Sequence, residues 1–374
     1  IHMKHLLLSF SSILFILSAC STDKQEASNS LVFTREDIPL HQILANPERI
    51  ELEDTFNDPF AYWLIQDSLV LVNNVPHNDN FLIEIFSLNT RKPILALGKI
   101  GNGPDEFGGC ECLVPSSQSP VFYIKDAGKS MFYVIDISET LKTQELAITQ
   151  KFHYNSAEIH PQTDVCLLNK QEYAGYSMWY LNDSTFKNDV PEIKIYPTEE
   201  LNTNAAPQMS FMEQYKYFVA DVNGANLIRV ANNRIWLAEK HQDRIRILND
   251  SLQVLKTIIG PDNYHLEYEN QKSNIPMPFI TFKQGKSYLS YAAWTLTDHS
   301  VYFIYQNLNG KKFNPEQLPI SEIYCFDKEG NPKYSYSTDR CILNLSIDSH
   351  EEYIYAATRT SSGEPVEFVR YKMN

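Results

Sequence analysis

Short apolar stretches that run into polar residues recur along the chain. Six of them begin at residues 69, 121, 165, 235, 301 and 353, as in Val121-Phe122-Tyr123-Ile124 followed by Lys125-Asp126. Runs of this length, rich in Val, Ile, Tyr and Phe, predict buried β-strands. Their starts are roughly 45 to 70 residues apart, which indicates a repeated all-β unit with loop insertions.

Each repeat carries further strand-like segments around the buried one. One precedes it, as at Tyr62 to Ile65, and two follow, as at Met131 to Ile135 and Leu146 to Ile148. Asn and Asp residues stand between these segments, as hairpin turns require. Six antiparallel four-stranded units predict an all-β, six-bladed β-propeller over residues 36–374. A pair of β-sandwiches is the alternative, but it does not account for six matched strands.

The last repeat is one strand short, because the sequence given ends soon after Val366 to Tyr371. Arg49 to Leu52 alternates between polar and apolar residues and has no repeat of its own. We expect it to pair with the last blade, which closes the ring and covers an exposed sheet edge. In the third repeat, Trp179 to Leu181 is expected to follow the buried strand, and Glu36 to Ala45 has a pattern that fits a helical turn or two.

The first residues predict an exported protein. Lys4 precedes an apolar stretch, Leu6 to Leu17, which is shorter than the about 20 residues that span a bilayer and fits a signal peptide over residues 1–19. Leu17-Ser18-Ala19-Cys20 follows and resembles the lipobox of bacterial lipoproteins, which implies a lipid on Cys20. An ordinary secretory signal is the alternative. Residues 20–35 are then a flexible tether, and an outer membrane lipoprotein on the periplasmic or cell-surface side is expected.

Charge and cysteine content narrow the functional classes. The 46 acidic residues outnumber the 32 basic ones, for a net charge of -14, so the chain lacks the basic excess that nucleic-acid binding needs. Five cysteines follow Cys20, and an odd number leaves at least one free thiol. Cys166 and Cys325 lie in apolar strand patterns, which predicts buried thiols, and a Cys325–Cys341 bridge is an open alternative.

One motif carries a family resemblance. Gly101-Asn102-Gly103-Pro104-Asp105-Glu106-Phe107 resembles the G-x-G-P-G-E-F signature of six-bladed propeller lipoproteins of Bacteroidetes, related to NHL and TolB-like propellers. Asp105 stands where the signature has its second glycine. The segment lacks the Lys-Ser/Thr of a phosphate-binding loop, so we expect a structural turn between blades. The resemblance implies the propeller fold and no agreed molecular function.

The candidate ligand-binding residues follow from topology. In an up-and-down blade, the second strand ends on the same face as the loop to the next blade, so polar strand ends and long insertions meet there. The predicted ligand-binding set on this face is Asp58, Glu111, Lys125, Asp126, Lys170, Asp221, Glu239 and Lys240. Ordinary solvation of strand ends and salt bridges between blades are the alternative explanation for these charges.

No catalytic, cofactor or metal motif stands out in the sequence, and its histidines are scattered. The prediction is therefore a lipid-anchored cell-envelope propeller that is a non-catalytic binding module for a glycan, a peptide or an envelope protein, with no cofactor and no metal. A propeller hydrolase or lyase, of lactonase or glycosidase type, is the alternative. It requires carboxylates that converge on the axis, among them Asp58, Glu111, Glu158 and Asp221.

Overall fold

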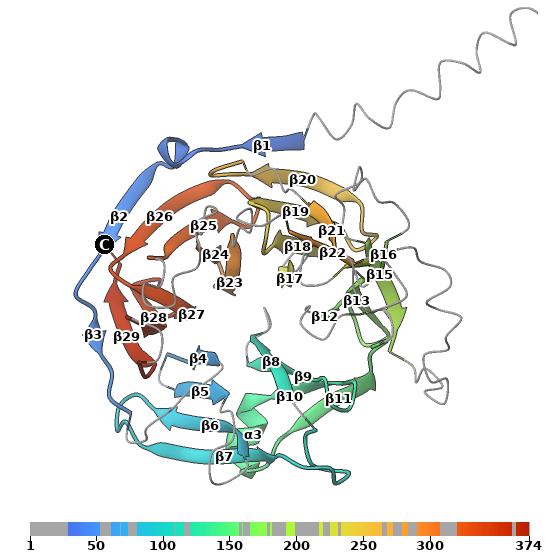
Figure 1. The fold of residues 1–374 in the computed structure, drawn as a ribbon. Helices are drawn as coiled ribbons and strands as arrows, with labels where there is room; N and C mark the ends of the chain where they lie inside the picture. The colour runs from blue at the N-terminus through green and yellow to red at the C-terminus, as the bar shows by residue number, and fades with distance from the viewer. Residues whose placement is uncertain are drawn as a thin grey trace, which may run out of the picture.

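The fold is an all-β propeller in which successive sheets surround a central axis (Figure 1). The computed structural model describes residues 29–52, 61–67, 69–73, 81–108, 110–115, 120–156, 159, 165–177, 180–181, 192–198, 217–219, 225–230, 233–263, 268–271, 279–282, 290–306, 320–360 and 364–373. Strands early in each repeat lie nearest the axis, and later ones lie toward the rim (Figure 1).

The sheets follow one another along the chain. The first sheet has β4 (Ala61–Ile65), β5 (Leu69–Asn73), β6 (Phe81–Ser87) and β7 (Pro93–Lys99); the second has β8 (Cys110–Pro115), β9 (Val121–Asp126), β10 (Met131–Asp136) and β11 (Ile148–His153). The next sheet has β12 (Val165–Leu167), β13 (Glu172–Ser177) and β15 (Glu192–Pro197). Then come β17 (Ala225–Val230), β18 (Arg234–Glu239), β19 (Arg244–Leu248) and β20 (Val254–Ile259).

Two further sheets complete this series. One has β23 (Tyr291–Leu296), β24 (Ser300–Tyr305), β25 (Glu322–Asp327) and β26 (Pro332–Thr338); the other has β27 (Cys341–Ile347), β28 (Tyr353–Arg359) and β29 (Glu367–Lys372). A separate sheet pairs β14 (Tyr180–Leu181), β16 (Tyr217–Val219), β22 (Phe279–Phe282) and β21 (Tyr268–Gln271).

The apolar second strands β18 and β24 are buried on both faces. Every residue of β24 is buried, and Trp236 of β18 packs against Phe303 of β24, with ring centroids 6.1 Å apart. Phe152 of β11 stacks on Tyr173 of β13 at 4.9 Å, which joins the second and third sheets. Neighbouring sheets thus pack face to face through aromatic side chains. A strand that is buried on both faces in this way has a continuous run of apolar residues in its sequence.

The N-terminal belt, residues 30–50, wraps the outer rim of three sheets (Figure 1). Its strand β1 (Ser30–Val32) pairs parallel with β20, β2 (Leu40–Leu44) pairs parallel with β26, and β3 (Glu48–Arg49) pairs antiparallel with β29. The amide of Ile50 extends this last contact by donating to the Phe368 carbonyl at 2.8 Å. The segment expected to pair with the last blade therefore does so, although its strand begins at Glu48.

The belt corrects two predictions. The tether expected over residues 20–35 ends earlier, because Ser30–Val32 is already paired with a sheet. The helical pattern at Glu36 to Ala45 was wrong for most of its length: a 3-10 helix covers Arg35–Asp37, and Leu40–Leu44 is a strand. The open edge of β26 offers backbone hydrogen bonds to these residues, and this tertiary pairing outweighs a weak local helical pattern.

Other strand limits also differ from the prediction. The helix α3 (Ile137–Thr143) follows β10 and was not anticipated; its start is capped by the Asp136 side chain, which accepts from the Glu139 amide at 3.0 Å. The fourth strand of that sheet begins at Ile148, later than expected. In the third repeat, Glu172–Ser177 follows the buried strand, and Tyr180–Leu181 belongs to another sheet.

The glycine-rich motif forms a turn between the first and second sheets. The Lys129 ammonium donates to the carbonyl of Gly103 at 2.5 Å and also to that of Glu106, while Phe107 is buried beneath the turn. Gly98 enters the turn with a φ of +71°, where an L side chain is strained. These contacts support the structural interpretation of the motif.

Candidate functional site

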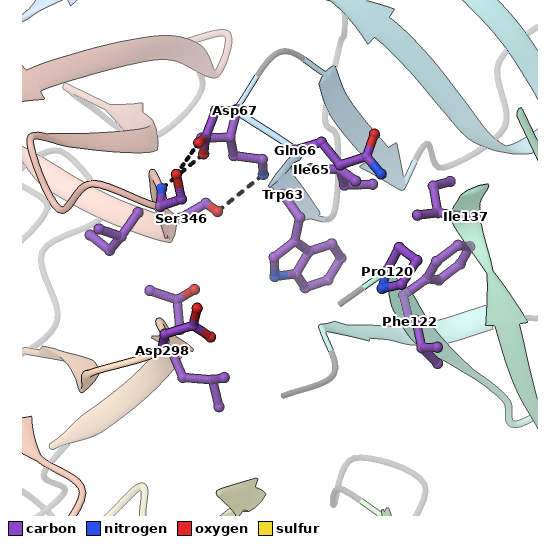
Figure 2. A pocket seen from close by; sticks show the side chains of 15 residues that line it. Trp63, Ile65, Gln66, Asp67, Pro120, Phe122, Ile137, Asp298 and Ser346 are labelled. Carbon is purple, nitrogen blue, oxygen red and sulfur yellow. Dashed lines mark hydrogen bonds between the residues drawn. The ribbon is translucent and has the colours of Figure 1, made fainter. Parts of the chain in front are cut away.

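A cavity of about 240 Å³ opens beside the axis at the end of the propeller where the first strands of the repeats stop (Figure 2). We call it the axial pocket. Residues from four sheets line it: Trp63, Leu64, Ile65, Gln66, Asp67, Pro120, Val121, Phe122, Ile137, Thr295, Leu296, Asp298, Ser346, Ile347 and Ser349. They come from the ends of β4, β23 and β27, the start of β9 and the residue after β10.

Trp63 supplies an unused hydrogen-bond donor to the axial pocket. It lies in the middle of β4 and is only 7% exposed, and its indole nitrogen is buried without a hydrogen-bond partner. Figure 2 shows this nitrogen on the side of the ring that faces Asp298, away from Phe122. A buried donor without a partner costs about 1–3 kcal/mol, so a group that accepts this hydrogen bond gains correspondingly in affinity.

Two serines fix the wall between the first and last sheets. The Asp67 carboxylate, in the hairpin after β4, accepts from the Ser349 amide at 2.8 Å and from the Ser349 hydroxyl. The Leu64 amide donates to the Ser346 hydroxyl oxygen at 3.0 Å. Both contacts join residues more than 280 positions apart, so this side of the pocket is set by the packing of the sheet of β4 against the sheet of β27.

Asp298 stands on the opposite wall with its carboxylate exposed. It lies in the hairpin between β23 and β24, whose turn is held by the Thr297 hydroxyl, which accepts from the amides of His299 and Ser300. Within the described residues, its carboxylate has neither an ion pair nor a hydrogen bond. It therefore offers a negative charge and four lone pairs to whatever enters the pocket.

The described lining combines a hydrogen-bond donor, an acceptor and apolar walls. Trp63 donates, Asp298 accepts, and Ile65, Phe122 and Ile137 provide apolar walls (Figure 2). The described lining residues include no histidine. No group of three or more His, Cys, Asp or Glu side chains in the described part of the chain is arranged to hold a metal ion.

The predicted ligand-binding residues that are described lie at the other end of the strands. Lys125 and Asp126 end β9, about 16 Å along the strand from Val121 at the axial pocket. Asp126 is fully buried and accepts from the amides of Gly108 and Lys129, while the Lys125 ammonium lies 5.0 Å from the centre of the Tyr154 ring. Both side chains make contacts within the fold.

The remaining members of the predicted set are described only in part. Glu239 is buried in an ion pair with Arg246 at 2.5 Å, whereas Lys170 is exposed. Lys240 is half-buried, and its carbonyl accepts from the Ser290 amide. Glu111 belongs to β8, and its side chain lies outside the described residues, as do Asp58, Asp221 and Glu158. Cys20 also falls outside them, so its lipidation stays a prediction.

Sequence reasoning selected the face with the longest insertions and missed the axial pocket. A usable signal was present, because Asp67 and Asp298 each stand two residues after the first strand of their repeat. Trp63 carried no such signal, since a tryptophan in an apolar strand is usually a core residue. The expected buried thiols are confirmed at Cys166 and Cys325. Cys341 is buried as well, and all three cysteines are free, so the Cys325–Cys341 bridge is not formed.

Sheets that succeed one another around an axis, with a cavity at one mouth, define a β-propeller. The sequence matches the model of the TolB-like 6-blade propeller-like family over residues 48–350, and the chain belongs to this family. No curated protein matches it in sequence.

One solved structure agrees on the fold. A member of the DUF4221 family from Bacteroides vulgatus superposes with a TM-score of 0.54 at 10% identity, over 89% of this chain and 97% of that one. The β-propeller domain of Cps50 (Swd1) from Myceliophteria thermophila reaches a TM-score of 0.41 at 10% identity, over 88% of this chain and all of that one (100%). Identities this low show the fold alone.

Proposed function

We propose that this protein is a non-catalytic binding module of the bacterial cell envelope, and that it binds a small ligand in the axial pocket. The observation that carries the proposal is the buried indole N–H of Trp63, which has no partner and faces a cavity of about 240 Å³. Apolar walls with a few convergent polar groups are typical of ligand sites. A glycan, a peptide end or a segment of an envelope protein could present the required group.

The proposed ring has six blades, closed by the N-terminal belt. Support comes from the family description and from the pairing of β3 with β29, which supplies the fourth strand that the last sheet lacks. The sheet of β12, β13 and β15 is then one of the six blades. Closure matters for function because Asp67 and Ser349, which meet across the closing junction, form one wall of the pocket.

The proposed location is the outer membrane, with a lipid on Cys20 as the anchor. The signal-like segment and the Leu17-Ser18-Ala19-Cys20 sequence support this. In the described part of the chain, no helix is both long and apolar enough to cross a bilayer. Nine residues separate Cys20 from β1, so the tether reaches at most about 35 Å. Incorporation of an alkyne-labelled palmitate that is lost in Cys20→Ala would support the anchor, whereas labelling that persists in this variant would refute it.

Binding can be followed at Trp63 itself. In NMR spectra of protein labelled with ¹⁵N-tryptophan, the four tryptophans give four indole N–H signals. The signal that is missing in Trp63→Phe belongs to Trp63. We expect at least one of methyl α-glucoside, leucinamide and N-acetyl-leucinamide to shift this signal saturably, because each carries an acceptor and fits a small cavity. A Trp63 signal that none of them moves up to tens of millimolar would count against the axial pocket as the site.

The alternative, a propeller hydrolase or lyase, has no observation in its favour among the described residues. Of the two pocket carboxylates, Asp67 is engaged by Ser349 through both oxygens. A general acid or nucleophile must be released to reach its substrate, so this arrangement suits a structural role.

A further inference from the structure

The described residues of the axial pocket carry negative charge without a compensating cation. Its described lining contains two carboxylates, on Asp67 and Asp298, and no Lys, Arg or His. The whole chain has a net charge of -14, so the surrounding potential also favours cations over anions. Ligands that present phosphate or carboxylate to this pocket are therefore disfavoured.

The two unused polar groups require different partners. The Trp63 indole N–H can only donate, so it needs an acceptor on the ligand, and the Asp298 carboxylate can only accept, so it needs a donor. Figure 2 shows both groups facing the same space. A charged donor is favoured at Asp298, because charge-assisted hydrogen bonds are about twice as strong as neutral ones and because a neutral hydroxyl leaves the carboxylate charge uncompensated.

We propose that the axial pocket binds a small organic cation in which a primary ammonium group stands close to a carbonyl or hydroxyl oxygen. The ammonium donates to Asp298, and the neighbouring oxygen accepts from the Trp63 indole. Aliphatic carbons of the same molecule lie against Ile65, Phe122 and Ile137. This inference rests on the proposed function, since it names the ligand class of the same pocket.

Geometry on the other wall supports the choice of Asp298 as the contact. Both carboxylate oxygens of Asp67 accept hydrogen bonds from Ser349, so Asp67 contributes negative charge while its position stays fixed. Asp298 is exposed at the mouth of the pocket and has no competing partner within the described residues, so binding breaks no existing ion pair. Asp298 can therefore receive a cation without losing a contact within the described part of the fold.

Leucinamide is the probe for this ligand class, and N-acetyl-leucinamide is its uncharged match. At pH 6 the amino group of leucinamide is protonated, because the pKa of an α-amino group is about 7.7 to 8.0. We expect leucinamide to move the Trp63 indole signal downfield and N-acetyl-leucinamide to bind at least tenfold more weakly. Raising NaCl from about 10 mM to 500 mM should weaken leucinamide binding, since screening reduces the attraction to an exposed carboxylate.

Asp298→Asn tests the contact, and Asp105→Asn is the matched control. Asp105 is also an exposed aspartate, but it lies in the glycine-rich turn between β7 and β8. We expect Asp298→Asn to weaken leucinamide binding about tenfold and Asp105→Asn to leave it unchanged. Unchanged positions of the other three indole signals show that each variant keeps the fold.

The outcomes separate the two proposals. If N-acetyl-leucinamide or methyl α-glucoside moves the Trp63 signal as readily as leucinamide, or if Asp298→Asn has no effect, the pocket binds ligands but the ammonium assignment is wrong. If none of the three probes moves the signal, the axial pocket itself is rejected as the binding site.

Discussion

Phe33 anchors the N-terminal belt in the core, and Phe33→Ala should destabilise the propeller strongly. The side chain is 2% exposed and meets Tyr324 and Phe326 edge to face, with ring centroids 5.8 Å away in both cases. Its amide donates to the Ile259 carbonyl at 2.9 Å, and Gly260, with a φ of +142°, leaves room for this approach. Any side chain at Gly260 would collide with the Phe33 backbone.

The expected loss is about 4 kcal/mol. Removing about 150 Å² of apolar surface from the core costs about 4 kcal/mol at about 25 cal/mol per Å², within the usual 3–5 kcal/mol for Phe→Ala. Backbone pairing of β1 with β20 remains available in the variant, so the loss reports on side-chain packing. Val32→Ala is the matched control, because the Val32 side chain, next to Phe33 in the sequence, is 59% exposed. The free energy of unfolding of this variant should change by no more than about 0.5 kcal/mol.

Urea unfolding measures the stability, and hydrogen exchange locates the effect. The strand β1 covers the edge of β20 at Thr257, Ile258 and Ile259, so Phe33→Ala should speed exchange in β20 before it does so elsewhere. A loss of less than about 1 kcal/mol together with unchanged exchange in β20 would refute the conclusion that the belt is an integral part of the fold.

Three further predictions concern buried groups. Burial raises the pKa of the Cys325 thiol to about 11, so it should stay unmodified by a thiol reagent at pH 8 until urea unfolds the protein; mass spectrometry shows whether native protein is labelled there. Burial, with the charge of Asp126, raises the pKa of Tyr133 to about 12. The stability that this raised pKa contributes is complete below about pH 10 and is lost as the pH rises toward 12. The unfolding free energy of Tyr133→Phe should therefore fall less steeply over that pH range than that of the unsubstituted protein. Lys129→Met removes the ammonium that holds two carbonyls of the glycine-rich turn and should cost about 1–3 kcal/mol, against less than about 0.5 kcal/mol for the exposed Lys142→Met, with urea midpoints as the measure.

Sequence patterns alone were sufficient for the fold class, an all-β propeller. Apolar strands such as Ile235 to Ala238 and Val301 to Ile304 are buried on both faces, so their composition reveals them without knowledge of their neighbours. The pairing of the N-terminal segment with the last sheet also followed from sequence, because a missing strand leaves an edge that must be covered. The structural role of the glycine-rich motif followed from the absence of any phosphate-binding context.

Tertiary structure decided where a site can form. Sequence patterns could not show that Arg35 of the belt reaches Asp262 at 2.6 Å and Glu322 at 2.9 Å, or that β1 and β2 would join the outer edges of two sheets. Nor could they distinguish Asp67, which Ser349 holds in place, from Asp298, which is open to a ligand.

The difference has a physical basis. Strand formation and burial depend on the local alternation and run length of apolar residues, which a single sequence displays. The axial pocket depends on which polar atoms meet when strands separated by hundreds of residues close around the axis, and the missing partner of the Trp63 N–H becomes visible only after that closure.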